Sequence, residues 1–300
     1  MKAINARTEL DRLENDSVAW LDRILRKAVI ANIQAKSQED KVRVKEELAE
    51  ALVRQQSTAD LLGRRRLFLD THGEEKKRSF SLYEIPEEKT ADEFIKRLEE
   101  EGTPEAEQIM QEHRKSVTSF ALGASLLAAW VIKKATKAVN RLIRREVKSG
   151  LSRDDAQAKV IKSLEDHDPE VSVTKSYAET VFRTNLNTAY TSARTQQATT
   201  PAFRNKVVAW KYVTMEDDRV RANHAAAHDF IAHVTDPIWK KLSPPMGFNC
   251  RCVLEAVGLS AAQRAGAATE SGLATYKLAP IGAHPDAGFQ ARGPRVVSDS

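Results

Sequence analysis

The stretch Lys206-Val-Val-Ala-Trp-Lys-Tyr-Val213 decides the fold, because the character of the chain changes there. Its residues alternate, and β-branched and aromatic side chains are frequent, which is typical of a β-strand. N-terminal to Pro201 the apolar residues recur instead at helical spacing. We therefore expect a mainly α protein, with a long helical N-terminal region and a small α+β module at the C-terminal end.

Two helical stripes open the chain, one from Leu10 to Ala31 and one from Val44 to Leu62. Each is apolar on one narrow face, so we expect a helical arm or hairpin that needs a partner surface. The second helix is expected to end near Gly63 and the run Arg64-Arg65-Arg66, and residues 67–85 are expected to form a linker or loop.

Capping residues mark the helices that follow. Thr90-Ala-Asp-Glu93 fits a capping box, and Thr103-Pro104-Glu105 begins a helix that extends to about Lys148. Ser152 caps another helix, and residues 176–197 form one more.

Shorter elements are expected after the strand at 206–213. They are a helix over 223–229, strands at 230–234 and 250–257, and an extended or flexible tail. The chain then divides into a helical, partner-binding arm (1–110), a helical core (111–200), a small α+β module rich in His and Cys (201–260) and the tail (261–300).

The bulk composition excludes some classes of protein. The net charge of +5 permits contact with nucleic acid but does not demand it. The only two cysteines, Cys250 and Cys252, are too close in sequence to join distant segments, so a reducing compartment is favoured and no signal peptide is evident. Residues 116–132 carry no charge, but they are short for a membrane span, and a buried helix is the better interpretation.

His224, His228, Cys250 and Cys252 fall within one short stretch. Histidines four apart share a helical face and cysteines two apart share a strand face, so these four side chains could complete a tetrahedral zinc site. Zinc is the one candidate cofactor. The pattern is incomplete, since it has neither the usual CxxC spacing nor the HExxH glutamate, and the alternative is a packed hairpin with buried cysteines. A Cys–His nucleophile pair is a further alternative, for which no base or oxyanion hole is defined.

A basic stripe occupies the helix that ends near Lys148. Its exposed face could follow DNA phosphates without reading sequence, since no aromatic residues are interleaved for base stacking. A solvated face or an acidic protein partner is an equal alternative. The candidate DNA-binding residues are Lys133, Lys137, Arg141, Arg144, Arg145 and Lys148.

The helix over 176–197 carries a row of polar side chains on one side. Buried polar groups need partners, so we expect a hydrogen-bonded and ion-paired network between this helix and the loop at 217–221. The residues of this structural network are Arg183, Asn187, Tyr190, Arg194, Asp218, Arg219 and Arg221.

Three motifs together resemble the phage Mu F-like head morphogenesis (minor head protein) family. They are AETVFRTNLNTAYTSAR at 178–194, the DDRVRANHAAAH segment at 217–228 and PPMGFNCRC at 244–252. His284-Pro-Asp-Ala-Gly-Phe289 is similar to a tail element of the family, although the residues after it depart from the usual Asn-Pro-Gly.

The resemblance implies a minor capsid component that is present in few copies at the portal vertex of a tailed phage. It would act in head assembly, DNA packaging or DNA ejection, without catalysis. The implied partners are the portal protein, the major capsid protein, packaged DNA or further copies of the chain, with no membrane. The implied location is the virion, after synthesis in the bacterial cytoplasm. The rival hypotheses are a zinc-dependent enzyme built on the His/Cys cluster and a plain DNA-binding protein.

Overall fold

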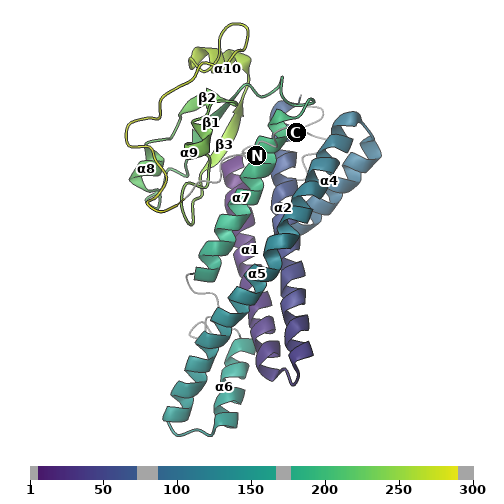
Figure 1. Ribbon diagram of the computed structural model, residues 1–300, viewed down its shortest axis with the longest axis vertical. Helices are drawn as coiled ribbons and strands as arrows, with labels where there is room; N and C mark the ends of the chain where they lie inside the picture. The colour runs from purple at the N-terminus through teal and green to yellow at the C-terminus, as the bar shows by residue number, and fades with distance from the viewer. Residues whose placement is uncertain (1–5, 73–86, 167–176, 290–300) are drawn as a thin grey trace. The chain divides into compact units, whose positions relative to one another are not determined.

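The computed structural model describes residues 6–72, 87–166 and 177–289 (Figure 1). Residues 73–85 of the expected linker and residues 290–300 of the expected tail lie outside the residues that the structure describes. The elements, in chain order, are α1 (Ala6–Gln34), α2 (Gln38–Thr71), α4 (Glu87–Glu101), α5 (Pro104–Lys148), α6 (Arg153–Glu165), α7 (Tyr177–Thr199), β1 (Ala209–Val213), α8 (Ala222–Ala225), β2 (Ile231–His233), α9 (Trp239–Leu242), β3 (Val253–Val257) and α10 (Leu259–Arg264). The predicted fold class, mainly α with a small α+β module at the C-terminal end, is confirmed.

The chain forms two compact units. The helical unit comprises Asn15–Gln55 and Val117–Phe182. The mixed unit comprises Met1–Glu14, Gln56–Ser116 and Arg183–Ser300. Each unit is assembled from separate stretches of the chain, so the units cut across the four consecutive segments expected from the sequence.

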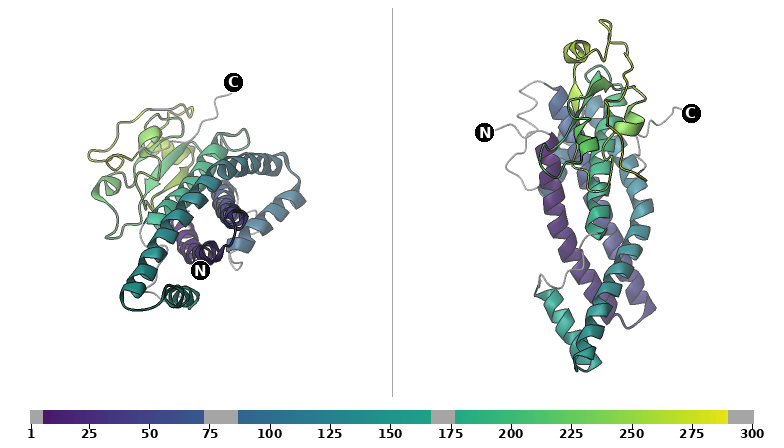
Figure 2. Two further views of the ribbon diagram at one scale, coloured as in Figure 1. Left: turned by 60° about the horizontal axis from the view of Figure 1, so that its bottom comes forward. Right: turned by 90° about the vertical axis from the view of Figure 1, so that its left-hand side faces the viewer.

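In the helical unit, α1 and α2 lie side by side as an antiparallel pair (Figure 1, Figure 2). Ser17 of α1 donates a hydrogen bond to Gln55 of α2 at 3.1 Å. Asn32 of α1 donates to Thr136 of α5 at 3.1 Å, which joins the pair to a third helix. Many apolar residues of these three helices are buried, among them Leu21, Leu25, Val29, Leu48, Leu52, Val131 and Val139. The partner surface that the opening stripes need is therefore supplied, for these residues, by the chain itself, and the partner-binding role of residues 1–110 stays a prediction.

The mixed unit contains a three-stranded antiparallel sheet in the order β2-β1-β3. Trp210 of the central strand β1 pairs with Ala232 on one side and Ala256 on the other. Trp210 and Tyr212 point into the larger core, while Ala209 faces a second cluster beside α10. Both faces of β1 are thus covered, which explains why this stretch is apolar almost throughout.

The expected end of the second helix is wrong. Helix α2 continues through Gly63 to Thr71, and Leu67, Phe68 and Leu69 are buried in the core of the mixed unit. The arginine run does not end the helix because it is not a solvated surface. Arg64 is paired with Asp60 at 2.9 Å and Arg65 with Glu9 at 2.6 Å, and both arginines are buried.

Gly63 lies where α2 approaches α7. A Cβ added there would stand 2.4 Å from the carbonyl oxygen of Tyr190, well inside van der Waals contact. Glycine is therefore required by the close approach of two helices rather than by a helix end.

No single helix among the described residues is long and apolar enough to cross a membrane. Only Pro104–Ala121 taken together with Ala124–Lys148 meets such a criterion, as a bent pair, and helices buried in a protein core meet it equally.

Candidate metal centre

Two short elements bring the chemistry-bearing side chains together inside the mixed unit. His224 lies in α8, which begins directly after Arg221. Cys250 and Cys252 immediately precede β3, and the extended backbone there places both sulfurs on the same side. The sulfur atoms lie 3.5 Å (Cys250) and 3.7 Å (Cys252) from Nδ1 of His224.

All three residues are buried, with His224 and Cys250 each 2% exposed and Cys252 3% exposed. Their potential ligand atoms lie within 4.8 Å of one another. Among the described residues, no other group of three or more His, Cys, Asp or Glu residues has this geometry.

Burial and mutual contact shift the titration of this cluster. Burial alone would raise the pKa of Cys250, but contacts with Cys252 and His224 outweigh burial and hold the pKa well below the usual thiol value. The contact with Cys250, together with burial, raises the pKa of Cys252 well above it. Burial alone would lower the pKa of His224, and the contact with Cys250 reverses the direction of that shift. Cys250 is therefore the more acidic thiol of the pair.

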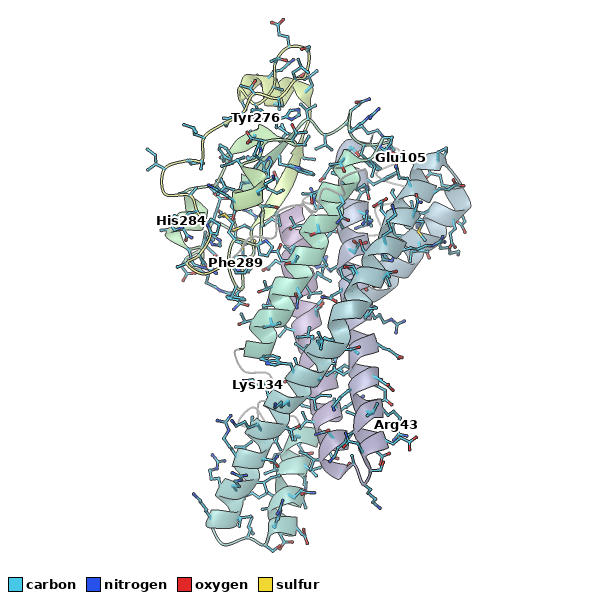
Figure 3. The ribbon with its side chains drawn as sticks, in the orientation of Figure 1. Arg43, Glu105, Lys134, Tyr276, His284 and Phe289 are labelled. Carbon is cyan, nitrogen blue, oxygen red and sulfur yellow. The ribbon has the colours of Figure 1, made fainter. Side chains whose placement is uncertain are left out.

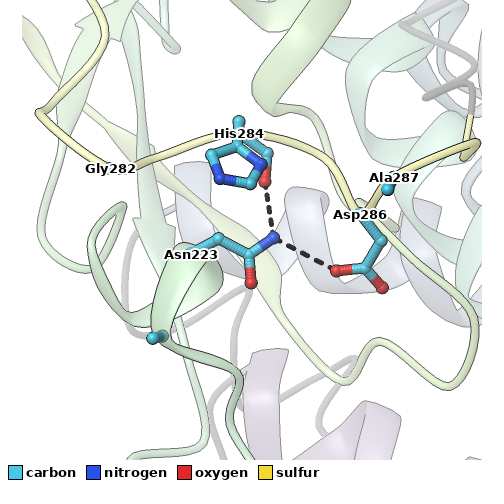
Figure 4. A pocket seen from close by; sticks show the side chains of 6 residues that line it. Asn223, Gly282, His284, Asp286 and Ala287 are labelled. Atoms are coloured by element: carbon cyan, nitrogen blue, oxygen red, sulfur yellow. Dashed lines mark hydrogen bonds between the residues drawn. The ribbon is translucent and has the colours of Figure 1, made fainter.

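Asp286 holds the other side of the imidazole. Nε2 of His224 donates to Oδ1 of Asp286 at 3.2 Å. Arg221 donates through Nε to the same carboxylate at 3.1 Å, and Asn223 donates through its amide at 3.1 Å. Asn223 also donates to the backbone oxygen of His284, so it ties α8 to the C-terminal segment at two points (Figure 4).

Gly247 makes room for this carboxylate. A Cβ at Gly247 would lie 1.8 Å from Oδ2 of Asp286, so no other residue fits there without displacing the acid. The backbone N–H of Asp286 donates to the oxygen of Met246 at 2.8 Å. The Pro-Pro-Met-Gly turn therefore serves as the platform on which Asp286 rests.

Three of the four predicted metal ligands come together, and His228 is not among them. The predicted shared helical face is wrong because α8 ends at Ala225. Nδ1 of His228 instead accepts a hydrogen bond from the backbone N–H of Thr214 at 3.1 Å. His233 and Asp229, which are near in sequence, also lie elsewhere: His233 contacts Thr235, and Asp229 pairs with Lys211.

Asn187 of α7 supports the cysteine segment from behind. Its side-chain amide donates to the backbone oxygens of Cys250, at 2.6 Å, and Cys252, at 3.3 Å. Thr191 donates to the amide oxygen of Asn187 at 2.9 Å. The side chain of Asn187 thus fixes the loop that carries both sulfurs.

The predicted polar row on α7 exists, but its partners differ from those expected. Tyr190 donates to Glu9 of α1 at 3.1 Å. Arg194 donates to Asp70 of α2 at 2.9 Å and to the oxygen of Leu254 in β3 at 3.0 Å. These side chains therefore join α7 to α1, α2 and β3 rather than to the loop at 217–221.

The remaining network residues lie around that loop. Arg221 is joined to Asp286 as described, and it also donates to the oxygen of Phe248. Asp217 pairs with Arg251 at 2.7 Å. Asp218 and Arg219 are exposed, and Arg183 is half-buried.

The predicted DNA-binding residues Lys133, Lys137, Arg141, Arg144, Arg145 and Lys148 are all exposed on α5, in the helical unit. Lys134, labelled in Figure 3, lies among them. Since each residue advances by about 100° around the helix axis, these seven side chains occupy a sector of about 120° on the surface of α5. The buried residues Val131, Ala135 and Val139 lie on the opposite side. Glu146 is paired with Lys159 of α6 at 2.7 Å and more distantly with Arg145 of the basic sector at 3.8 Å.

Two groups of the site were not among the predicted residues. Asp286 lies in the expected tail, and its signal was the family-like segment His284–Phe289. Tyr212 is fully buried, and its hydroxyl lies in hydrogen-bonding contact with Cys250 and Cys252. Burial, followed by the charges of Cys250 and Cys252, raises the pKa of Tyr212. Its hydroxyl therefore faces the sulfur pair, for which the strand pattern offered no signal.

Two chemistries use a thiol beside an imidazole that a carboxylate holds. One is a cysteine nucleophile with its base and orienting acid. A substrate must reach such a nucleophile, and both thiols are buried in the structure. The other is a metal ion, which needs no access once it is bound and which makes use of two sulfurs around one nitrogen.

Comparisons with known proteins agree with the motifs. Residues 139–255 match the family model described as Phage Mu protein F like protein. This region includes α7, the sheet, His224 and both cysteines. The resemblance to the phage Mu F-like family is therefore confirmed.

Two curated relatives share this similarity. The Mu-like prophage FluMu F protein of Haemophilus influenzae is 31% identical over an alignment of 182 residues that covers 55% of this chain and 44% of the relative. The Putative capsid assembly protein F of Escherichia phage Mu is 37% identical over 84 residues, 28% of this chain and 18% of the relative. The chain thus spans less than half the length of either relative. No solved structure gives a significant match.

Proposed function

We propose that this protein is a minor head protein of a tailed phage that acts in head morphogenesis at the portal vertex. The similarity to a relative named as a putative capsid assembly protein carries the proposal. The role is structural, and the protein resides in the virion. The chemistry-bearing cluster supports a role without catalysis, because its sulfurs are enclosed by α8, β3 and the C-terminal segment.

A head protein needs a surface for its neighbours, and the opening helices do not supply one through their buried stripes. The segment after α10 exposes large apolar side chains, including Tyr276, which Figure 3 labels. Leu278 is 92% exposed and Ile281 is 101% exposed. Apolar side chains exposed to this degree in one short segment favour contact with another protein.

Capture of the cognate head proteins tests this proposal. The tagged chain is mixed with the portal and major capsid proteins of the same phage, and the retained protein is measured after size-exclusion chromatography. The wild-type chain is expected to retain the portal protein, and the variant Leu278→Asp with Ile281→Asp is expected to lose it. Leu126→Asp makes the same kind of change at a leucine that is 77% exposed on α5 and serves as the matched control. Failure of the folded wild-type chain to retain either head protein contradicts the proposal.

The basic face of α5 favours a second activity, contact with packaged DNA. From Lys133 to Lys148 the helix extends by about 22 Å, roughly two-thirds of a DNA turn. Exposed lysines and arginines over that length can neutralise several phosphates, and the absence of aromatic residues between them predicts binding that is blind to sequence.

The salt dependence of the DNA-binding constant distinguishes binding through the basic face of α5 from a general attraction of the positively charged protein to DNA. Replacement of Lys137, Arg141 and Arg144 by Gln is expected to reduce the slope of log K against log salt by about 2.7, because about three phosphate contacts are lost. The matched control replaces the exposed Lys240, Lys241 and Arg264 by Gln and changes the net charge equally. Equal slopes for both triple variants, measured by fluorescence anisotropy on duplex DNA, would refute the assignment to α5.

A further inference from the structure

We propose that His224, Cys250 and Cys252 bind a structural zinc ion through Nδ1 and the two sulfur atoms, with Asp286 as the residue that positions the imidazole. Zinc would then join three parts of the mixed unit that are distant in sequence: α8, the start of β3 and the C-terminal segment. This site is independent of the head-assembly role.

The spacing of the three atoms fits a tetrahedral ion. Zinc bonds of about 2.3 Å to sulfur and about 2.1 Å to nitrogen, at tetrahedral angles, place sulfur and nitrogen about 3.6 Å apart. The two sulfurs lie 3.5 and 3.7 Å from Nδ1 of His224, so the cluster needs little movement to accept the ion. One nitrogen with two sulfurs is also a soft ligand set that favours zinc over magnesium or calcium.

The imidazole is held in the orientation and tautomer that a metal needs. An ionised carboxylate only accepts hydrogen bonds, so the 3.2 Å contact with Asp286 requires the proton on Nε2 and leaves Nδ1 as the free ligand. A carboxylate behind a ligating histidine is the usual support of zinc sites. Arg221 and Asn223 fix that carboxylate in turn.

Tyr212 provides an independent observation. Its hydroxyl is fully buried and lies in hydrogen-bonding contact with both cysteines. With zinc bound, this hydroxyl supplies a polar group for the fourth position, directly or through a water molecule.

The charges of the proposed zinc site also balance. A zinc ion displaces the thiol protons of both cysteines, and the two negative charges that result would be costly to bury without the cation. A divalent ion with two thiolates and one neutral imidazole makes an uncharged centre. The protein interior can accommodate such a centre without further ion pairs.

The first test is the metal content of the full chain, purified without added metal and measured by inductively coupled plasma mass spectrometry. We expect about one zinc ion per folded chain. Cys250→Ser, Cys252→Ser and His224→Ala should each lose most of it, while the matched His228→Ala and His233→Ala variants should keep it. Asp286→Ala should weaken binding 10- to 100-fold in a chelator competition, because it only positions a ligand.

A second measurement does not depend on the folding of any variant. Wild-type protein is stripped with a chelator and titrated with cobalt(II), which is expected to give thiolate charge-transfer absorption and the intense visible bands of a tetrahedral site. Folded wild-type protein that contains no zinc and shows no such bands on addition of cobalt(II) would overturn the proposal.

Discussion

The close approach of α2 and α7 predicts that Gly63→Ala destabilises the protein, although alanine is the better helix former. A glycine-to-alanine change inside an exposed helix is normally worth about 1 kcal/mol in favour of alanine. Here the new Cβ would stand 2.4 Å from the backbone oxygen of Tyr190 and 3.2 Å from the Cβ of Ala193. The two helices must therefore separate by about 1 Å to restore normal contact.

That separation has a cost that can be estimated. Overpacking of a core by one methyl group costs typically 1–3 kcal/mol, and the upper end, about 3 kcal/mol, applies because the obstructing atom belongs to the backbone. The gain in helix propensity offsets about 1 kcal/mol of this. The expected net loss in the free energy of unfolding is about 2 kcal/mol, or a fall in melting temperature of about 4–8 °C.

Urea and thermal denaturation followed by circular dichroism measure this loss. Gly258→Ala is the control without a steric clash, because nothing lies within 4 Å of a Cβ at that position; since Gly258 is the N-cap of α10, it should cost about 0.5–1 kcal/mol, less than Gly63→Ala. If Gly63→Ala is as stable as the wild type or more stable, the described contact between α2 and α7 is incorrect.

Three further predictions follow from single contacts. Arg194 and Arg66 outweigh burial and lower the pKa of Asp70, so the ionised carboxylate stabilises the fold fully above its unfolded pKa of about 4, and this stabilisation is lost as the pH falls below that value. Asp70→Asn should therefore flatten the fall of the urea midpoint between about pH 5 and 3, and an unchanged profile would refute the pairing. Asn187→Leu leaves two buried backbone oxygens without their donor and should cost about 2–4 kcal/mol in urea unfolding, so a neutral effect would contradict the described support. Gly247→Ala should displace Asp286 and weaken zinc binding about 10-fold or more without removing a ligand, whereas unchanged affinity would show that the acid does not position the imidazole.

Most helices could be predicted because their apolar spacing and caps are local signals. Ser152, for example, caps α6 and accepts a hydrogen bond from the backbone N–H of Asp155, as its position predicted. The end of α2 could not be predicted, because the partners of the arginine run are not local. Glu9, which pairs with Arg65, is more than fifty residues away in sequence.

The candidate metal centre shows the same limit. Residue chemistry singled out His224, Cys250 and Cys252, and the structure brings them together. His228 was included because a longer helix was expected, and the early end of α8 removes it. Asp286 completes the site through a fold-back of the chain that no local pattern encodes.

The most direct test of the proposed role is an in-frame deletion of the coding sequence in the phage that encodes this chain. DNA-filled heads are then counted by electron microscopy, and the chain is sought in purified heads by mass spectrometry. We expect the chain in wild-type heads, a loss of filled heads on deletion, and recovery when the wild-type sequence is supplied from a plasmid. Filled, infectious heads in normal numbers without the chain, together with its absence from wild-type heads, would contradict the account.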